Sequence, residues 1–140
     1  MRILKIRTEK REIGNIGEGL AAKFLKKIGY KILEKNYADS GNEIDIIAED
    51  KEHIIFVEVK TRTLGHQSPK EPRPASAVTP EKQRKIISAA KYFTEKKATQ
   101  KKMRFDVIEV YLTEEKKADK ILHLKSAFNY DTAKARSKFM

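Results

Sequence analysis

The sequence predicts an α/β fold in which a central mixed β-sheet is flanked by helices. Two observations carry this prediction. Segments with helical periodicity alternate with runs of period two, in the order α-β-β-β-α-β-β. The second helical segment separates two such runs, and a helix between strands implies a crossover connection within the sheet. The 140 residues suffice for a single domain with one hydrophobic core.

The first helix is expected from Ile13 to Ile28. Its apolar residues recur at helical spacing, with lysines on the opposite side, and Gly29 is a typical helix end. Glu18 lies on the border of the apolar stripe. The preceding residues 1–12 are basic, and we expect them to form an extension outside the domain.

Three strands are expected next, at 30–37, 43–49 and 54–61, separated by polar turns. A loop then runs from Arg62 to Val78 and contains three prolines. Loops of this length are usually functional or disordered. A flap over a substrate and a tolerated surface insertion are both compatible with it.

The second helix is expected to begin at Thr79-Pro80, which reads as an N-cap followed by an N1 proline, and to continue to about Lys97. Strands at 103–112 and 121–124 complete the expected domain. Residues 130–140 are expected to form a basic tail.

Three ionisable residues interrupt the apolar runs of the second and third strands. Period two places Glu58 and Lys60 on one face of their strand, and the preceding hairpin can bring Asp45 beside Glu58. Adjacent carboxylates repel unless a proton or a cation lies between them. With oxygen ligands and no cysteine, the expected cation is Mg²⁺ or Mn²⁺.

A purely structural interpretation of the same residues is also open. Lys60 could neutralise Glu58, and Asp45 could be a solvated residue near a strand end. The combination of spacing, apolar flanks and a shared face favours the site.

The order Asp45, then Glu58-Val59-Lys60, resembles the PD-(D/E)XK nuclease signature, and the wider sequence is similar to the YraN-like family of small bacterial proteins. The bare signature is degenerate, but the ordered set of matching elements is specific. These elements are Gly17-Glu18 with Ala21-Ala22, residues 29–33, Asn36, residues 41–47, residues 56–62, Ala77-Val78 with Lys82, residues 104–107, and Ala127-Phe128. The resemblance implies a restriction-endonuclease-like fold and a nuclease domain at residues 13–129.

The resemblance also implies roles for single residues. Asp45 and Glu58, with the carbonyl of Val59, would bind Mg²⁺ or Mn²⁺, and Lys60 would orient or deprotonate a water. Glu18 would complete the metal site, although a surface pair with Lys23 explains it equally well from the residues alone.

Thirty-one basic against twenty acidic residues give a formal charge of +11, which indicates a polyanionic partner, with nucleic acid favoured. The segment 82–104 carries nine basic residues and one acidic residue. Most such runs are solvated helix faces, but here a phosphate-binding surface is plausible. The residues expected to bind nucleic acid are Thr61, Arg62, Lys82, Gln83, Arg84, Lys85 and Arg104. Asp106 is interpreted as a structural partner of Arg104 or of a helix end.

No cysteine is present, which excludes disulfides and thiolate zinc sites, and the three histidines are scattered. No stretch is apolar enough to form a signal-peptide core or to span a bilayer, so a cytoplasmic protein is expected.

The expected function is metal-dependent endonucleolytic hydrolysis of nucleic acid, with DNA favoured and branched substrates as an option. Two alternatives are a non-catalytic nucleic-acid-binding module and an interaction protein for the ribosome or a membrane surface. The residues do not decide between DNA and RNA, or between a monomer and a homodimer.

Overall fold

A computed structural model describes the backbone of residues 2–63 and 78–130 and the side chains from Arg7 onward within these ranges. The predicted element order is confirmed. The elements are α1 (Arg2–Lys27), β1 (Lys31–Asp39), β2 (Asn42–Glu49), β3 (His53–Thr63), α2 (Pro80–Lys97), β4 (Lys102–Leu112) and β5 (Ala118–Phe128). Most of the expected flap and the expected tail, at residues 64–77 and 131–140, lie outside the described residues.

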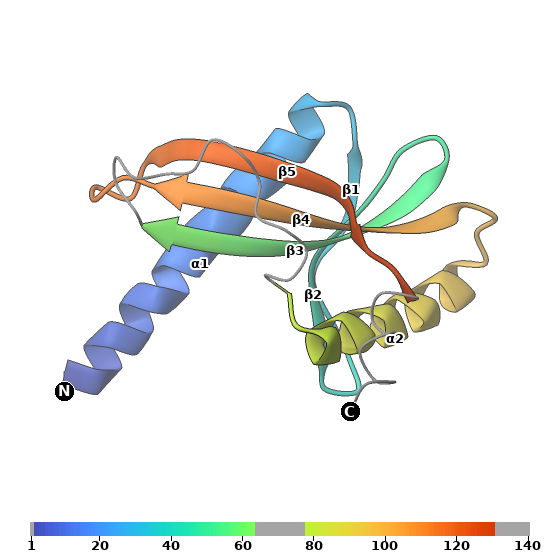
Figure 1. The fold of residues 1–140 in the computed structure, drawn as a ribbon, viewed down its shortest axis with the longest axis horizontal. Helices are drawn as coiled ribbons and strands as arrows, with labels where there is room; N and C mark the ends of the chain where they lie inside the picture. The colour runs from blue at the N-terminus through green and yellow to red at the C-terminus, as the bar shows by residue number, and fades with distance from the viewer. Residues whose placement is uncertain (1, 64–77, 131–140) are drawn as a thin grey trace.

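The five strands form one mixed sheet in the order β1-β2-β3-β4-β5. All neighbouring strands are antiparallel except β3 and β4, which are parallel because α2 carries the chain back between them. As Figure 1 shows, α1 and α2 lie against different faces of the sheet. The fold is thus an α/β sandwich of three layers with the element order of a restriction-endonuclease-like domain.

Two hydrophobic clusters fix the helices on the sheet. Ile55 and Val57 of β3 pack toward α1, whereas Ile54 and Phe56 of the same strand pack toward α2. The period-two assignment of these side chains is therefore confirmed. A row of stacked rings, with centroids 5.5 and 5.3 Å apart, extends the α2 side from Phe56 across Phe105 to Phe128.

The predicted stop signal at the C-terminal end of α1 and the predicted N-cap at the start of α2 are both present. Gly29 has a positive φ of 99°, and the amides of Gly29 and Tyr30 donate to Lys26 and Leu25, which is the Schellman pattern. The Thr79 side chain accepts a hydrogen bond from the amide of Lys82 at 3.1 Å, as an N-cap does. These ends set where β1 starts and how α2 approaches the sheet.

Two elements are longer than expected. Helix α1 begins at Arg2, because residues 2–12 contain neither glycine nor proline and continue the helix that apolar periodicity revealed only from Ile13. Strand β5 runs from Ala118 to Phe128, whereas only 121–124 was expected. Its outer positions are mostly polar, and pairing with β4 holds them in the sheet.

In the described part of the chain, no helix is long and apolar enough to cross a bilayer.

Candidate active site

The site lies where β2 and β3 separate. Pairing between these strands runs from Glu49↔Ile54 to Ile46↔Val57 and then stops, while β3 remains paired with β4 up to Thr63↔Leu112. Beyond the last pair, the next residues are Asp45 on β2 and Glu58 on β3. Both carboxylates therefore lie at the point where the two strands separate, which we call the fork.

Asp45 closes the fork with its side chain. Its Oδ2 accepts a hydrogen bond of 2.8 Å from the amide of Val59, which lies beyond the last pair between β2 and β3. Burial raises the pKa of Asp45, and the Val59 hydrogen bond and the charges of Lys82 and Lys60 partly offset this. As the sequence predicts, Asp45 lies beside the Glu58-Val59-Lys60 run.

Glu58 is the most perturbed acid of the site. The residue is 7% exposed, and burial together with the nearby Asp45 charge raises its pKa to about 7. Its Oε1 lies 3.8 Å from Nζ of Lys60, while its buried Oε2 has no hydrogen-bond partner. A buried oxygen without a partner is costly unless a further group binds there.

Glu18 reaches the same place from α1. The helix can come close because residue 17 is glycine: a Cβ there would overlap the side chain of Thr61 on β3. Burial raises the pKa of Glu18, and so do the charge of Asp45 and a side-chain hydrogen bond with it, whereas Lys35 and Asn36 lower it. The arrangement favours the site over the alternative surface pair with Lys23.

A pocket of about 470 Å³ opens in front of these carboxylates. Its lining combines the acids with residues of α1 and the end of β3: Lys10, Ile13, Gly14, Glu18, Asp45, Glu58, Val59, Thr61 and Thr63. Lys82, in the first turn of α2, acts electrostatically on both Asp45 and Glu58. Cations and carboxylates therefore meet at one opening, as they must to bind a charged phosphate and a cation together.

The other residues expected to bind nucleic acid do not all lie at the pocket. Thr61 lines the pocket, and Arg62 follows it on β3, with a buried Nε that has no hydrogen-bond partner. Gln83 is buried and donates to the carbonyl of Val78, so this bond holds the start of α2. Arg84 and Lys85 are exposed on α2.

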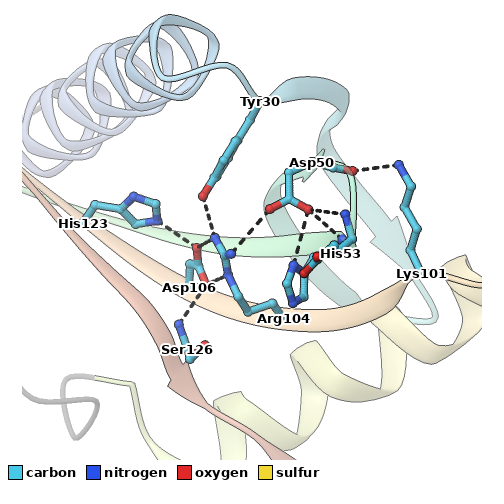
Figure 2. Close-up of polar contacts among 9 residues, drawn as sticks. Tyr30, Asp50, His53, Lys101, Arg104, Asp106, His123 and Ser126 are labelled. Atoms are coloured by element: carbon cyan, nitrogen blue, oxygen red, sulfur yellow. Dashed lines mark hydrogen bonds and ion pairs between the residues drawn. The ribbon is translucent and has the colours of Figure 1, made fainter.

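Arg104 is not brought to the site. Figure 2 shows its guanidinium bound inside the protein, where Nε and Nη2 donate to both oxygens of Asp106 at 2.9 and 2.7 Å and Nη2 also donates to the Tyr30 hydroxyl. Its Nη1 lies 3.7 Å from Asp50, and the whole side chain is 12% exposed. The interpretation of Asp106 as a structural partner of Arg104 is confirmed, and the same contacts occupy the guanidinium that was expected to bind nucleic acid.

The residues at the fork fit a hard divalent cation. In the described ranges, no group of three or more His, Cys, Asp or Glu side chains is arranged as a ready metal site. Mg²⁺, however, is commonly held by one or two carboxylates and otherwise keeps water. Asp45 and Glu58, with the unpartnered Oε2 of Glu58, supply such a pair.

Sequence reasoning gave no role in this site to two of its residues. Asn36 lies opposite Asp45, between the pairs Lys35↔Ile46 and Tyr37↔Ile44, and has a positive φ of 53°. Asparagine tolerates that conformation, which is the signal that could have marked it. Lys10 lies in the part of α1 that was expected to be an extension, and only the full length of the helix places it at the pocket.

Comparison with known proteins places this site in a family. A model of "Uncharacterised protein family UPF0102" matches residues 17–110, which include all four predicted catalytic residues. A UPF0102 protein of Caldanaerobacter subterraneus subsp. tengcongensis is 45% identical over 124 residues, covering 87% of this chain and 98% of the relative. One of Caldicellulosiruptor saccharolyticus is 44% identical over 120 residues, covering 85% and 98%. One of Clostridium perfringens is 48% identical over 120 residues, covering 84% and 94%. The chain therefore belongs to the UPF0102 family, the YraN-like family that its motifs resemble.

Proposed function

We propose that this protein is a metal-dependent endonuclease that hydrolyses phosphodiester bonds in nucleic acid. The observation that carries the proposal is the fork between β2 and β3, where Glu58 keeps a buried, unpartnered oxygen beside Asp45 and within 3.8 Å of the Lys60 ammonium. Two acids and a lysine at one opening form the minimum set for hydrolysis of a phosphodiester with help from a divalent cation.

Asp45 and Glu58, with the carbonyl of Val59, would hold Mg²⁺ or Mn²⁺, and Glu18 would support them from α1. The cation, when bound, lowers the pKa of water and offsets negative charge on the phosphate. Before it binds, Glu58 exchanges a proton near neutral pH, because its pKa is about 7. Loss of this proton prepares the carboxylate as a ligand.

Lys60 would act on the attacking water and on the phosphate. Its Nζ lies 3.8 Å from Oε1 of Glu58, which places it beside the fork. From there it can orient a water by hydrogen bonding and counter the charge that grows in the transition state.

Binding of the polyanion would rely on cations around the pocket. Lys10 lines the pocket, and Lys82 faces the two acids from the first turn of α2. The formal charge of +11 would draw nucleic acid toward them. DNA is our preferred substrate, and cytoplasm the preferred location.

The proposal is tested with labelled single-stranded, duplex, flapped and four-way-junction DNA, and with RNA, in Mg²⁺ or Mn²⁺. We expect wild-type protein to cleave at least one substrate and Asp45→Asn to cleave none. Asp39→Asn, which removes an acid from the same hairpin away from the fork, is the matched control and should cleave normally. Equal activity of wild type and Asp45→Asn would refute the proposal.

A second candidate is a nucleic-acid-binding module without catalysis. The lack of a ready three-ligand metal group among the described residues favours it. In the same panel, binding to nucleic acid by all three proteins with no cleavage in either cation would support this candidate.

A further inference from the structure

A second pocket lies between β1 and the C-terminal half of α2, and it has a different chemical character. It has a volume of about 330 Å³ and is lined by Leu33, Glu34, Tyr37, Phe93, Lys96 and Lys97. It shares none of these residues with the carboxylate pocket. Two aromatic rings and two lysines at one opening suit a ligand with a flat ring and an anionic group.

The aromatic part of this pocket is held from within the core. The rings of Tyr37 and Phe93 meet edge to face, with centroids 5.3 Å apart, and Phe93 in turn meets Phe56 at 6.1 Å. The Tyr37 hydroxyl, like that of any protonated tyrosine, can donate a hydrogen bond. The pocket therefore offers fixed rings and a polar donor.

Two exposed tyrosines lie against lysines of α2: Tyr92 is on the helix itself, beside the pocket, and Tyr130 follows β5. Tyr92 is 44% exposed with Nζ of Lys96 at 5.1 Å from its ring centroid, and Tyr130 is 53% exposed with Nζ of Lys91 at 4.8 Å. Tyr92 and Lys96 also act electrostatically on the Tyr37 hydroxyl, which places them close to the pocket. Each exposed ring is thus paired with a cation that can bind a phosphate next to it.

Helix polarity explains only part of this arrangement. Lysines in the last turn of a helix offset the negative end of its dipole, and Lys96 and Lys97 occupy that turn. That effect needs charge alone. It does not require an exposed tyrosine beside Lys96, nor a pocket with aromatic walls.

We propose that this surface binds a single-stranded stretch of nucleic acid, with one base in the Tyr37–Phe93 pocket and a neighbouring base on Tyr92. Lys96 and Lys97 would contact the phosphates between them. Only unpaired bases can offer their faces to protein rings, because in a duplex those faces are covered by stacking. The inference rests on the proposed function for its nucleic-acid partner and adds that the preferred substrate has a single-stranded part.

The test compares binding of a labelled single strand and a blunt duplex by fluorescence anisotropy, without divalent cation. We expect Tyr92→Leu to weaken single-strand binding about tenfold, the lower range for loss of one base–aromatic stack, and to leave duplex binding unchanged. Tyr92→Phe keeps the ring and should bind as wild type does. Lys96→Gln should weaken binding more than Lys23→Gln, which removes an exposed lysine from α1.

Because Tyr37 packs against the core, its pocket is tested with the wild-type protein. A strand containing 2-aminopurine should lose fluorescence on binding as its base stacks in the pocket. Unchanged fluorescence, or equal losses of single-strand and duplex affinity in Tyr92→Leu, would overturn the inference. Metal-dependent cleavage by wild type alongside either result would leave the proposed function standing, whereas binding of neither nucleic acid by wild type would refute both.

Discussion

Glu58 is the residue whose surroundings oppose its charge most strongly. It is buried, faces Asp45, and receives only partial compensation from Lys82 and Lys60, so its pKa rises to about 7. A group arranged in this way costs folding free energy that a purely structural role would not justify. The physical consequence is a pH dependence of stability that can be measured without any substrate.

We predict that Glu58→Gln stabilises the protein at pH 8 and has little effect near pH 4. The pKa of Glu58 in the folded protein lies above its value of about 4.3 in the unfolded chain. The proton on Glu58 therefore stabilises the folded protein fully below about pH 4.3, and this stabilisation is lost as the pH rises through about 7. One pKa unit corresponds to about 1.4 kcal/mol, so the gain at pH 8 should be roughly 3–4 kcal/mol. Urea unfolding of both proteins at the two pH values measures it. An equal effect at both values would contradict the account.

Asp106 shows the opposite behaviour. Burial alone would raise its pKa, but hydrogen bonds from His123, Arg104 and the amide of Ser126 lower it below the ordinary value. Its stabilising contribution is therefore present above the unfolded pKa and is lost as the pH falls through the folded one.

We predict that Asp106→Asn destabilises the protein by about 3–5 kcal/mol at pH 7, because it leaves the buried Arg104 charge without its partner. The advantage of the wild type should shrink as the pH falls below the unfolded pKa of about 3.9, and it is lost as the pH passes through the lower folded pKa, where Asp106 takes up a proton. Urea midpoints across this range provide the measurement, with the exposed Glu114→Gln as control. A difference independent of pH would show that the carboxylate charge is not responsible.

The sequence predicted the residues of the fork better than their neighbours. Period two placed Glu58 and Lys60 together, and the hairpin placed Asp45 beside them, because strand geometry determines which side chains share a face. The contacts of Arg104 with Tyr30 and Asp50 depend on how separate elements pack, which no local pattern encodes. For the same reason, Asn36 was matched as a motif residue without a role.

At the scale of elements, the contact of α1 with β3 decides whether Glu18 can reach the acids. Gly17 and Thr61 are the residues that meet there, and Glu18 is the next residue of the helix. Sequence periodicity indicated which face of α1 is apolar. It gave neither this close approach nor the first eleven residues of the helix, because polar helical turns lack an apolar signal.

We predict that Gly17→Ala lowers both stability and cleavage, because its methyl group would overlap Thr61 and push α1 away from β3. Gly19→Ala is the matched control. No atom lies within 4 Å of its added Cβ, and alanine in an open helical position should stabilise by roughly 0.5–1 kcal/mol. Thermal unfolding and cleavage rates of both variants test this. Similar behaviour of the two variants would argue against the close contact.

At the scale of the whole molecule, both helices carry many basic residues, yet Lys82 is the helix lysine whose charge acts on both Asp45 and Glu58. Each phosphate contact releases counterions and steepens the salt dependence of binding. The position of a lysine should therefore affect both the affinity for nucleic acid and the slope of log affinity against log salt concentration.

We predict that Lys82→Gln lowers the slope of log affinity against log salt concentration by about 1. Lys23→Gln removes the same charge from an exposed position on α1 and should leave the slope close to that of wild type. Anisotropy titrations over a series of salt concentrations give both slopes. Equal reductions would mean that overall charge, and not the position of Lys82, governs binding.

The most direct test of the central claim is the rate of cleavage in Mn²⁺ by wild type and Lys60→Ala, compared at equal fractions of bound substrate. We expect the variant to be at least about a hundredfold slower, the range for loss of a positioned acid–base group, while its affinity changes little. Equal loss of affinity and rate, or cleavage at the wild-type rate, would contradict the assignment of Lys60 to the chemistry.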